Sequence, residues 1–145
     1  MKKIALALCN VHNAGFLHND LKANNVVLDK ERGEDKFNPV VIDFGKSLPM
    51  TSLKGPKKLS HQEQVKYTDK YPHIAPEIVE GSMGQSVKSD IFSFGKLCES
   101  VFAIAKLGHL PEVLARALSL DPDKRPTLEA VIESLQNVQR SSNAN

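Results

Sequence analysis

The sequence predicts a mainly helical fold around one buried central helix, with a few short β-strands near the N-terminal end. Residues 87–105 carry apolar side chains on nearly every side, which is typical of a helix enclosed by a core. Amphipathic helical patterns lie before and after this segment. Residues 46–74, in contrast, have no sustained periodicity and are interrupted by Gly and Pro, which predicts a long loop.

The N-terminal elements follow from local patterns. Residues 3–14 are predicted to form a helix with its apolar residues on one face, and Gly15 can end it because glycine adopts a left-handed conformation at little cost. The polar, mostly charged stretch 29–38 is predicted to be a connector. Short apolar runs predict three strands, at residues 16–18, 25–28 and 39–42.

Two shorter helices are predicted after the central one. The first begins near Pro111, a favoured residue in a first helical turn, and stops at residues 121–122. The second begins after Thr127, whose hydroxyl can cap it. Residues 1–140 are therefore predicted to form one domain, and residues 141–145 a disordered tail.

Composition narrows the possible partners. The 145-residue chain has 19 basic and 17 acidic residues and a net charge of +2, which gives no electrostatic reason to expect nucleic acid or an anionic membrane as a partner. No apolar run approaches the roughly 20 residues that span a bilayer. The N-terminus resembles a short signal peptide, but Asn10 and His12 interrupt its apolar run, so a cytoplasmic or nuclear location is expected.

The two cysteines give no sign of special chemistry. Cys9 and Cys98 are far apart and each lies in an apolar stretch, so both are predicted to be buried free thiols rather than a disulfide or redox pair. No further His or Cys joins them at metal-ligand spacing. The function must therefore be inferred from other motifs.

Five short motifs occur in a meaningful order. Residues 18–25 read HNDLKANN, residues 41–45 VIDFG and residues 75–77 APE, followed by SDIFSFG at 89–95 and DPDKRPT at 121–127. They resemble, in order, five segments of eukaryotic-type protein kinases: the catalytic loop, the metal-binding segment, the end of the activation segment, the central helix and the approach to the last helix. One triplet alone would be weak evidence. Five ordered matches identify the chain as a member of this family, specifically its C-terminal (large) lobe.

The resemblance implies ATP and Mg²⁺ as cofactors and Ser or Thr of a protein as the phosphate acceptor. Asp20 would accept the proton of the substrate hydroxyl or orient it, and Lys22 would offset charge on the transferred phosphate. Asn25 and Asp43 would hold magnesium that bridges the ATP phosphates. Val27 would lie beneath the adenine ring. A solvated surface lysine at position 22 and plain core packing at position 27 are the alternatives.

Other matched residues are expected to be structural. The resemblance implies that His18 and Phe44 stack in the buried column that links the two kinase lobes. Asp90 would accept hydrogen bonds from backbone amides of the catalytic loop. Glu77 and Arg125 would form an ion pair beneath the activation segment, and removal of one partner of such a buried pair is costly.

The sequence also departs from the family pattern. Asn19 replaces the catalytic-loop arginine that gathers a phosphorylated residue. The usual Gly-Thr would fall on residues 69–70 and is missing, so the Thr contact to Asp20 is expected to be lost. Only residues 106–110 separate the central helix from Pro111, where the family has a further docking helix.

The N-terminal lobe is the largest departure. Nothing before His18 matches the Gly-rich loop or the strand lysine of a complete kinase, so the N-lobe sheet is expected to be absent and the isolated chain inactive. Lys22 resembles the lysine of serine/threonine kinases, and residues 71–74 together with the extended connector 29–38 resemble the tyrosine-kinase-like group. The expected partner is a protein substrate or another kinase. Two alternatives stay open: a truncated, pseudokinase-like binding or regulatory module, and a partial gene model.

Overall fold

The structure, a computed structural model, describes residues 1–145 except 31–32, 34–35 and 144–145. For 138–139 and 141–143 the description covers the backbone alone. The helices are α1 (Lys2–Asn13), α2 (His61–Lys70), α3 (Pro76–Glu80), α4 (Val87–Ile104), α5 (Glu112–Arg116) and α6 (Leu128–Asn143). The strands are β1 (Phe16–Leu17), β2 (Val26–Lys30), β3 (Phe37–Val41) and β4 (Leu48–Pro49). Short 3₁₀ turns occupy Ala23–Asn25, Met50–Ser52 and Pro122–Lys124.

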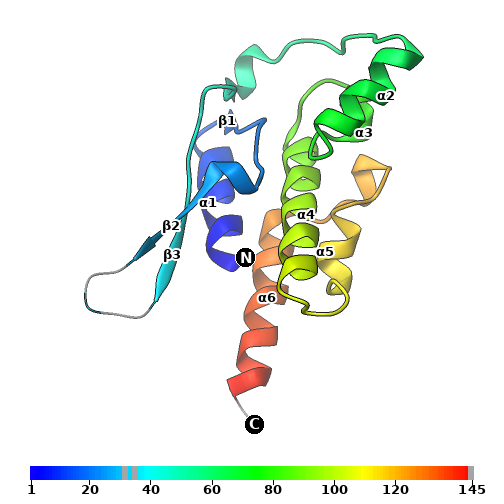
Figure 1. The fold of residues 1–145 in the computed structure, drawn as a ribbon. Coiled ribbons are helices and arrows are strands. Elements are labelled where there is room, and N and C mark those ends of the chain that lie inside the picture. The colour runs from blue at the N-terminus through cyan, green and yellow to red at the C-terminus, as the bar shows by residue number, and fades with distance from the viewer. Residues whose placement is uncertain (31–32, 34–35, 144–145) are drawn as a thin grey trace.

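Helix α4 lies in the middle of the helical body, as predicted (Figure 1). Ser86 caps it in a reciprocal pair with Ser89, which satisfies backbone amides that have no partner within the helix. Its burial covers the first two-thirds of the helix only: residues 89–95 and 97–98 are buried, whereas Ile104 is 83% exposed. The apolar pattern therefore predicted the central helix correctly and overstated the burial of its last turn.

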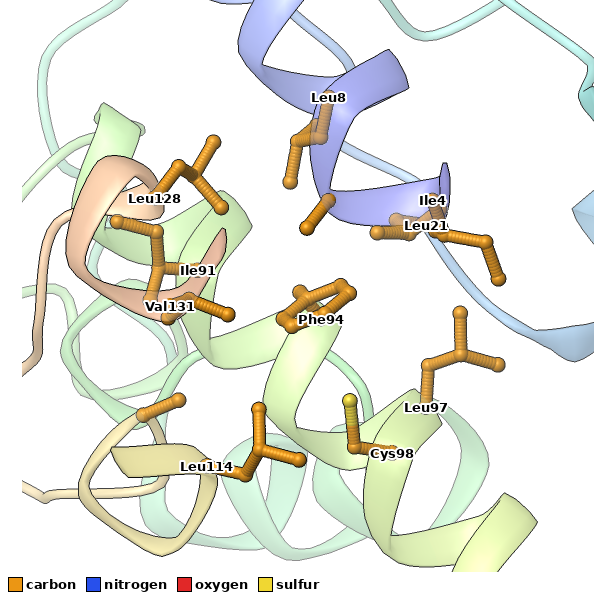
Figure 2. Close-up of a cluster of buried hydrophobic side chains, with 12 residues drawn as sticks. Ile4, Leu8, Leu21, Ile91, Phe94, Leu97, Cys98, Leu114, Leu128 and Val131 are labelled. Carbon is orange, nitrogen blue, oxygen red and sulfur yellow. The ribbon is translucent and has the colours of Figure 1, made fainter. Parts of the chain in front are cut away.

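One hydrophobic core joins α4 to its neighbours. Figure 2 shows Phe94 among side chains of α1, α4, α5 and α6. Leu21 also belongs to this cluster, although it comes from the loop after β1. The core members are Ile4, Ala5, Leu8, Leu21, Ile91, Phe94, Leu97, Cys98, Leu114, Ala117, Leu128 and Val131.

The strands form two small antiparallel sheets, β1 with β4 and β2 with β3. The β2–β3 hairpin projects beside the helical body (Figure 1). Its register pairs Val26 with Val41 and still pairs Asp29 with Asn38, so both strands extend into the predicted connector 29–38. The prediction was too short because backbone pairing continues where the side chains turn polar and exposed.

Helix α2 corrects the prediction of one long loop over residues 46–74. The Ser60 hydroxyl accepts from the Glu63 backbone amide, while the Glu63 carboxylate accepts from Ser60 N–H at 2.8 Å, which is a complete capping box. None of the ten described residues of α2 is buried. The helix therefore has no apolar stripe for a periodicity search to find. Strand β4 and the 3₁₀ turn Met50–Ser52 were missed as well, because they are too short to show a period.

The C-terminal boundaries also differ from the prediction. Helix α5 stops at Arg116, five residues before the predicted end at 121–122, where a separate 3₁₀ turn begins. Thr127 Oγ1 accepts from Ala130 N–H at the start of α6, as expected of a cap. Helix α6 continues to Asn143, so residues 141–143 are helical rather than a tail, because neither Gly nor Pro interrupts the chain there. Residues 144–145 lie outside the described residues.

Both cysteines are described and both are free, as predicted. Cys98 is buried, and this burial raises the pKa of its thiol to about 12. Cys9 is only half-buried, so the expectation of two buried thiols was wrong for this residue. No described helix combines the length and the apolar character that a membrane crossing requires.

Candidate functional site

The Asp20 loop (residues 18–25) is anchored at both sides of its key carboxylate. Leu17, just before the loop, and Leu21, directly after Asp20, are fully buried. Asn19 adopts a positive φ of 63°, a conformation in which Asn is enriched among non-glycine residues. The chain then enters the 3₁₀ turn Ala23–Asn25 and continues directly into β2. Core packing and this turn together hold Asp20 in place.

The Asp90 carboxylate fastens the loop to the start of α4. Its Oδ2 accepts from His18 N–H at 2.8 Å, and its Oδ1 accepts from Asn19 N–H at 2.9 Å. The His12 ring nitrogen Nε2 lies 2.9 Å from Oδ2. Asp90 is 1% exposed, so these three contacts replace the water that the carboxylate loses. The structure thus contains the backbone contacts that the resemblance implies for Asp90, and adds His12, which sequence analysis missed.

Asp20 is 4% exposed and lies among donors and cations. Its Oδ1 lies 2.9 Å from His73 Nε2, 3.5 Å from Lys22 Nζ and 3.6 Å from Lys46 Nζ. Its Oδ2 accepts from Asn25 Nδ2 at 3.1 Å. Burial raises the pKa of Asp20, but the His73 hydrogen bond, the two lysines and Asn25 outweigh it and bring the pKa below its ordinary value. The side chain is therefore a carboxylate at neutral pH.

His73 is the contact that sequence analysis did not find. Burial lowers the pKa of His73 and outweighs the opposing effect of Asp20, so the ring is neutral at pH 7. Because Asp20 is ionised, the Nε2 proton must lie on the shared hydrogen bond and be donated to the carboxylate. Ser93 on α4 also donates to the His73 carbonyl at 2.6 Å. Position 70, where the family pattern places its Thr, is a lysine, and the same segment supplies His73 to Asp20.

The segment after β3 brings Asp43 next to Asn25. Ile42 N–H donates to the Asn25 carbonyl at 2.9 Å, one residue before Asp43. Asp43 has a positive φ of 61°, its Oδ1 accepts from Gly45 N–H at 3.1 Å, and its side chain is exposed. Asn25 is buried, and its amide nitrogen also donates to the Asp20 carbonyl at 2.7 Å. One exposed carboxylate and one fixed amide thus lie on neighbouring segments.

His18 and Phe44 are in ring contact, with centroids 5.0 Å apart and planes tilted by 59°. His18 is fully buried, and its Nδ1 accepts from Asp20 N–H at 3.2 Å, which assigns the ring proton to Nε2 beside the Ile42 carbonyl. Phe44 is 49% exposed, so only the His18 half of the expected column is buried.

Val27 does not pack in the core. It is 43% exposed on β2, opposite Val40 of β3. The core-packing alternative for this residue was therefore wrong. Val27 and Val40 are both exposed and lie on one side of the hairpin, whereas the exposed Leu28 and Phe37 lie on the other, because successive strand residues face opposite sides.

Arg125 and Glu77 form the second buried charged centre. Arg125 donates from its two terminal nitrogens to the two Glu77 oxygens, both at 2.7 Å. It also donates to the carbonyls of Ser119 and Lys88, both at 2.9 Å, and its guanidinium lies 5.0 Å from the centre of the Phe92 ring. Arg125 is 2% exposed and Glu77 4%. The bidentate geometry is the strong form of such a pair.

Asn19 lines a cleft on one side of the Asp20 loop. Its Nδ2 donates to the Lys46 carbonyl at 3.1 Å, while Oδ1 is buried with no partner in the described part of the chain. The cleft has a volume of about 300 Å³, and Lys46, Lys54 and Tyr67 are among its lining residues.

The structure brings together Asp20, Lys22 and Asn25, with Asp43 on the segment next to Asn25. It keeps Glu77 and Arg125 in a separate centre.

Comparison with known proteins agrees with these features. A family model described as a protein kinase domain matches residues 1–107. A probable serine/threonine-protein kinase, fnkE of Dictyostelium discoideum, is 29% identical over 96% of this chain and 11% of its own length. Serine/threonine-protein kinase Nek8 of Danio rerio is 31% identical over 90% of this chain and 20% of its own length. Protein kinase YpkA of Yersinia pestis is 40% identical over 63% of this chain and 11% of its own length. The chain spans a fifth or less of each of these relatives.

Proposed function

The chain belongs to the protein kinase domain family, and from this premise we propose that it forms the part of a serine/threonine protein kinase that holds magnesium-ATP phosphates and the acceptor hydroxyl. The observation that carries the proposal is the Asp20 carboxylate, buried and ionised, with Lys22 and Asn25 in contact. The transferred group would be the ATP γ-phosphate, and the acceptor a Ser or Thr of a protein.

Asp20 would orient the acceptor hydroxyl and take its proton. A general base must be unprotonated at the working pH, and the lowered pKa of Asp20 meets this requirement. His73 and Asn25 hold the two carboxylate oxygens in a fixed orientation. Fixed geometry matters because phosphoryl transfer depends mainly on positioning and charge neutralisation. Lys22 lies beside Asp20, where its charge can offset that of a phosphate.

The donor set fits magnesium better than a softer metal. Asp43 offers a carboxylate, and the amide oxygen of Asn25 remains because its nitrogen is bound to Asp20; both are hard oxygen ligands. The described residues contain no cluster of three or more His, Cys, Asp or Glu side chains that could hold a metal alone. Magnesium often takes only one or two protein ligands and completes its shell with water and phosphate. When bound, the ion neutralises phosphate charge.

Serine and threonine are the proposed acceptors because Lys22 lies two residues after Asp20, a spacing that resembles serine/threonine kinases. Two similar proteins, fnkE and Nek8, are named as a probable serine/threonine-protein kinase and a serine/threonine-protein kinase, which is consistent with this assignment. Val27 would contact the adenine ring with its exposed apolar side chain.

A second candidate function is a kinase-like binding module. The exposed pair Val27 and Val40 on one side of the β2–β3 hairpin, with exposed Leu28 and Phe37 on the other, favours it, because exposed apolar surface can mark an interaction site. Such a module would not need magnesium-dependent nucleotide binding, so this property separates the two candidates.

The deciding experiment is calorimetric titration of the chain with ATP, with and without Mg²⁺. We expect binding that requires Mg²⁺ and is lost in Asp43→Ala and in Asn25→Ala. Asp123→Ala, which removes an exposed carboxylate in the 3₁₀ turn before α6, is the matched control and should bind as the unaltered chain does. Affinity that survives Asp43→Ala or removal of Mg²⁺ would contradict the proposal and favour the binding module.

A further inference from the structure

We propose that a lysine-lined cleft beside Asp20 binds an acidic side chain of the peptide substrate, so that the site selects acceptor residues with Asp or Glu nearby. This inference rests on the proposed function, because it assigns a substrate class to the same site. The lysine cleft is defined by Lys22, Lys70, Tyr71, His73, Lys96 and Leu97.

Three separate parts of the chain form the lysine cleft. Lys22 comes from the Asp20 loop, Lys70 ends α2 and leads into Tyr71 and His73, and Lys96 lies on α4. The volume is about 370 Å³, which is large enough for one side chain of a peptide. Leu97, one of its lining residues, is buried.

The cleft adjoins the carboxylate that would receive the acceptor hydroxyl. Lys22 and His73 line it, and each also contacts Asp20 Oδ1, at 3.5 and 2.9 Å. A peptide whose hydroxyl lies at Asp20 therefore has neighbouring residues within reach of the cleft, since an extended chain advances only about 3.3 Å per residue. Asp43, the proposed magnesium ligand, is not among the lining residues, so we assign the cleft to the peptide, with Lys22 at its border with the transferred phosphate.

The charge of the cleft favours an anion. Three lysines line it, and no Asp or Glu does so among the residues that the structure describes. Lys22 is partly balanced by Asp20, and Lys96 forms an ion pair with Glu99. Lys70 contacts the Tyr71 ring, 5.2 Å from its centre, and within the described ranges it forms no ion pair.

A carboxylate in this position would meet a cation that lacks an acidic partner. The apolar parts of Tyr71 and Leu97 in the lining lower the local polarity, which strengthens the attraction relative to an open surface. A basic peptide residue would instead be repelled, so the same charges discriminate against the opposite class of substrate.

The test compares three peptides that share one serine and differ only in its flanking residues, which are Asp, Asn or Lys. Fluorescence polarisation at low ionic strength should show the Asp peptide binding about fivefold more tightly than the Asn peptide. Added salt should reduce this preference. The double variant Lys70→Gln/Lys96→Gln should bind the Asp and Asn peptides equally. Lys54→Gln, a lysine of the Asn19 cleft, is the matched control and should keep the preference.

A charge reversal guards against loss of fold in the double variant. Lys70 is exposed, so Lys70→Glu should fold, and it should bind the Lys peptide more tightly than the Asp peptide. Equal affinity of the unaltered chain for the Asp and Asn peptides, no binding of either, or a preference that persists in both variants would overturn the inference. Magnesium-ATP binding is measured on the same samples. If it is retained without an acidic preference, only this inference fails; if it is lost while the preference remains, only the kinase proposal fails.

Discussion

Two charged centres, one around Arg125 and one around Asp20, bury their charges in different ways. Arg125 is closed: one carboxylate and two backbone carbonyls use its donors, and all these partners come from the protein. Asp20 is held more openly, because two of its partners are lysines whose side chains are 32% and 60% exposed. Arg125 is buried, so a ligand cannot reach its guanidinium. The lysines beside Asp20 are accessible to a ligand.

This difference separates stability from function within one small body. A closed ion pair contributes by the cost of breaking it, since the remaining partner is then a buried unpaired charge. An open carboxylate with exposed lysines contributes less to folding, because water already screens part of its interactions. We therefore expect substitutions at the Arg125 centre to affect unfolding, and substitutions around Asp20 to affect mainly ligand binding.

The largest expected effect is that of Arg125→Met. It should lower the free energy of unfolding by about 3–5 kcal/mol, because Glu77 is left charged and buried. Denaturant unfolding measures this change. Lys124→Met, at the exposed neighbouring position, should have almost no effect, and the double variant Arg125→Met/Glu77→Leu should recover part of the loss. An unchanged unfolding midpoint for Arg125→Met would show that the Arg125–Glu77 pair contributes no more to stability than the Asp20 contacts do.

Asp90→Asn should have the next largest effect. The substitution weakens charge-assisted hydrogen bonds from the His18 and Asn19 amides, and we expect a loss of about 2–3 kcal/mol of unfolding free energy. Hydrogen exchange should show faster exchange at these two amides in particular. Asp123→Asn, on the surface, is the control. Full protection of both amides in Asp90→Asn would show that Leu17 and Leu21 alone hold the loop.

The sequence predicted the closed centre better than the open one. Central helix α4 was recognisable because its apolar side chains surround it, and burial leaves a periodic signal. Helix α2 left no such signal because none of its described residues is buried. Its capping box, Ser60 followed three residues later by Glu63, is nevertheless a sequence pattern typical of a helix start. The contact of Glu77 with Arg125 followed from the family resemblance, and the structure contains it.

His73 and Lys46 could not be found in this way. Both reach Asp20 across long sequence separations, and no local pattern predicts such a contact. Position 73 carried one signal that could have been used: it lies two residues before the Ala75-Pro76-Glu77 motif, in a segment already expected to pass close to Asp20. A histidine there has both the reach and the donor to take over a lost hydroxyl contact.

A smaller effect is expected at the Ser60 cap of α2, which leads to the His73 side of the open centre. Ser60→Ala should lower the free energy of unfolding by about 1 kcal/mol, or fray α2 without affecting the global transition. Hydrogen exchange within α2 distinguishes these two forms of the result. Thr68→Ala, at an exposed position inside the same helix, should not increase exchange. Unchanged exchange in Ser60→Ala would mean that contacts with α3 hold the helix instead.

The smallest effect is a pH dependence at His73. The pKa of His73 is lowered in the folded chain by burial, from an ordinary value near 6.5. Just below that pH the unfolded chain binds a proton that the folded chain does not bind, so the contribution of neutral His73 to stability is present above about pH 6.5 and is lost as the pH falls through and below it. The lowered pKa of Asp20 acts separately, in the acidic range below its ordinary value of about 3.9.

His73→Gln keeps a donor for Asp20 but does not titrate. The difference in unfolding free energy between the unaltered chain and this variant should therefore shrink as the pH falls from about 7.5 to about 5.5, while the other histidines cancel. A constant difference would show that folding leaves the pKa of His73 unchanged, and a widening one would show that Asp20 holds protonated His73 as an ion pair. The open centre would then be as closed as that of Arg125.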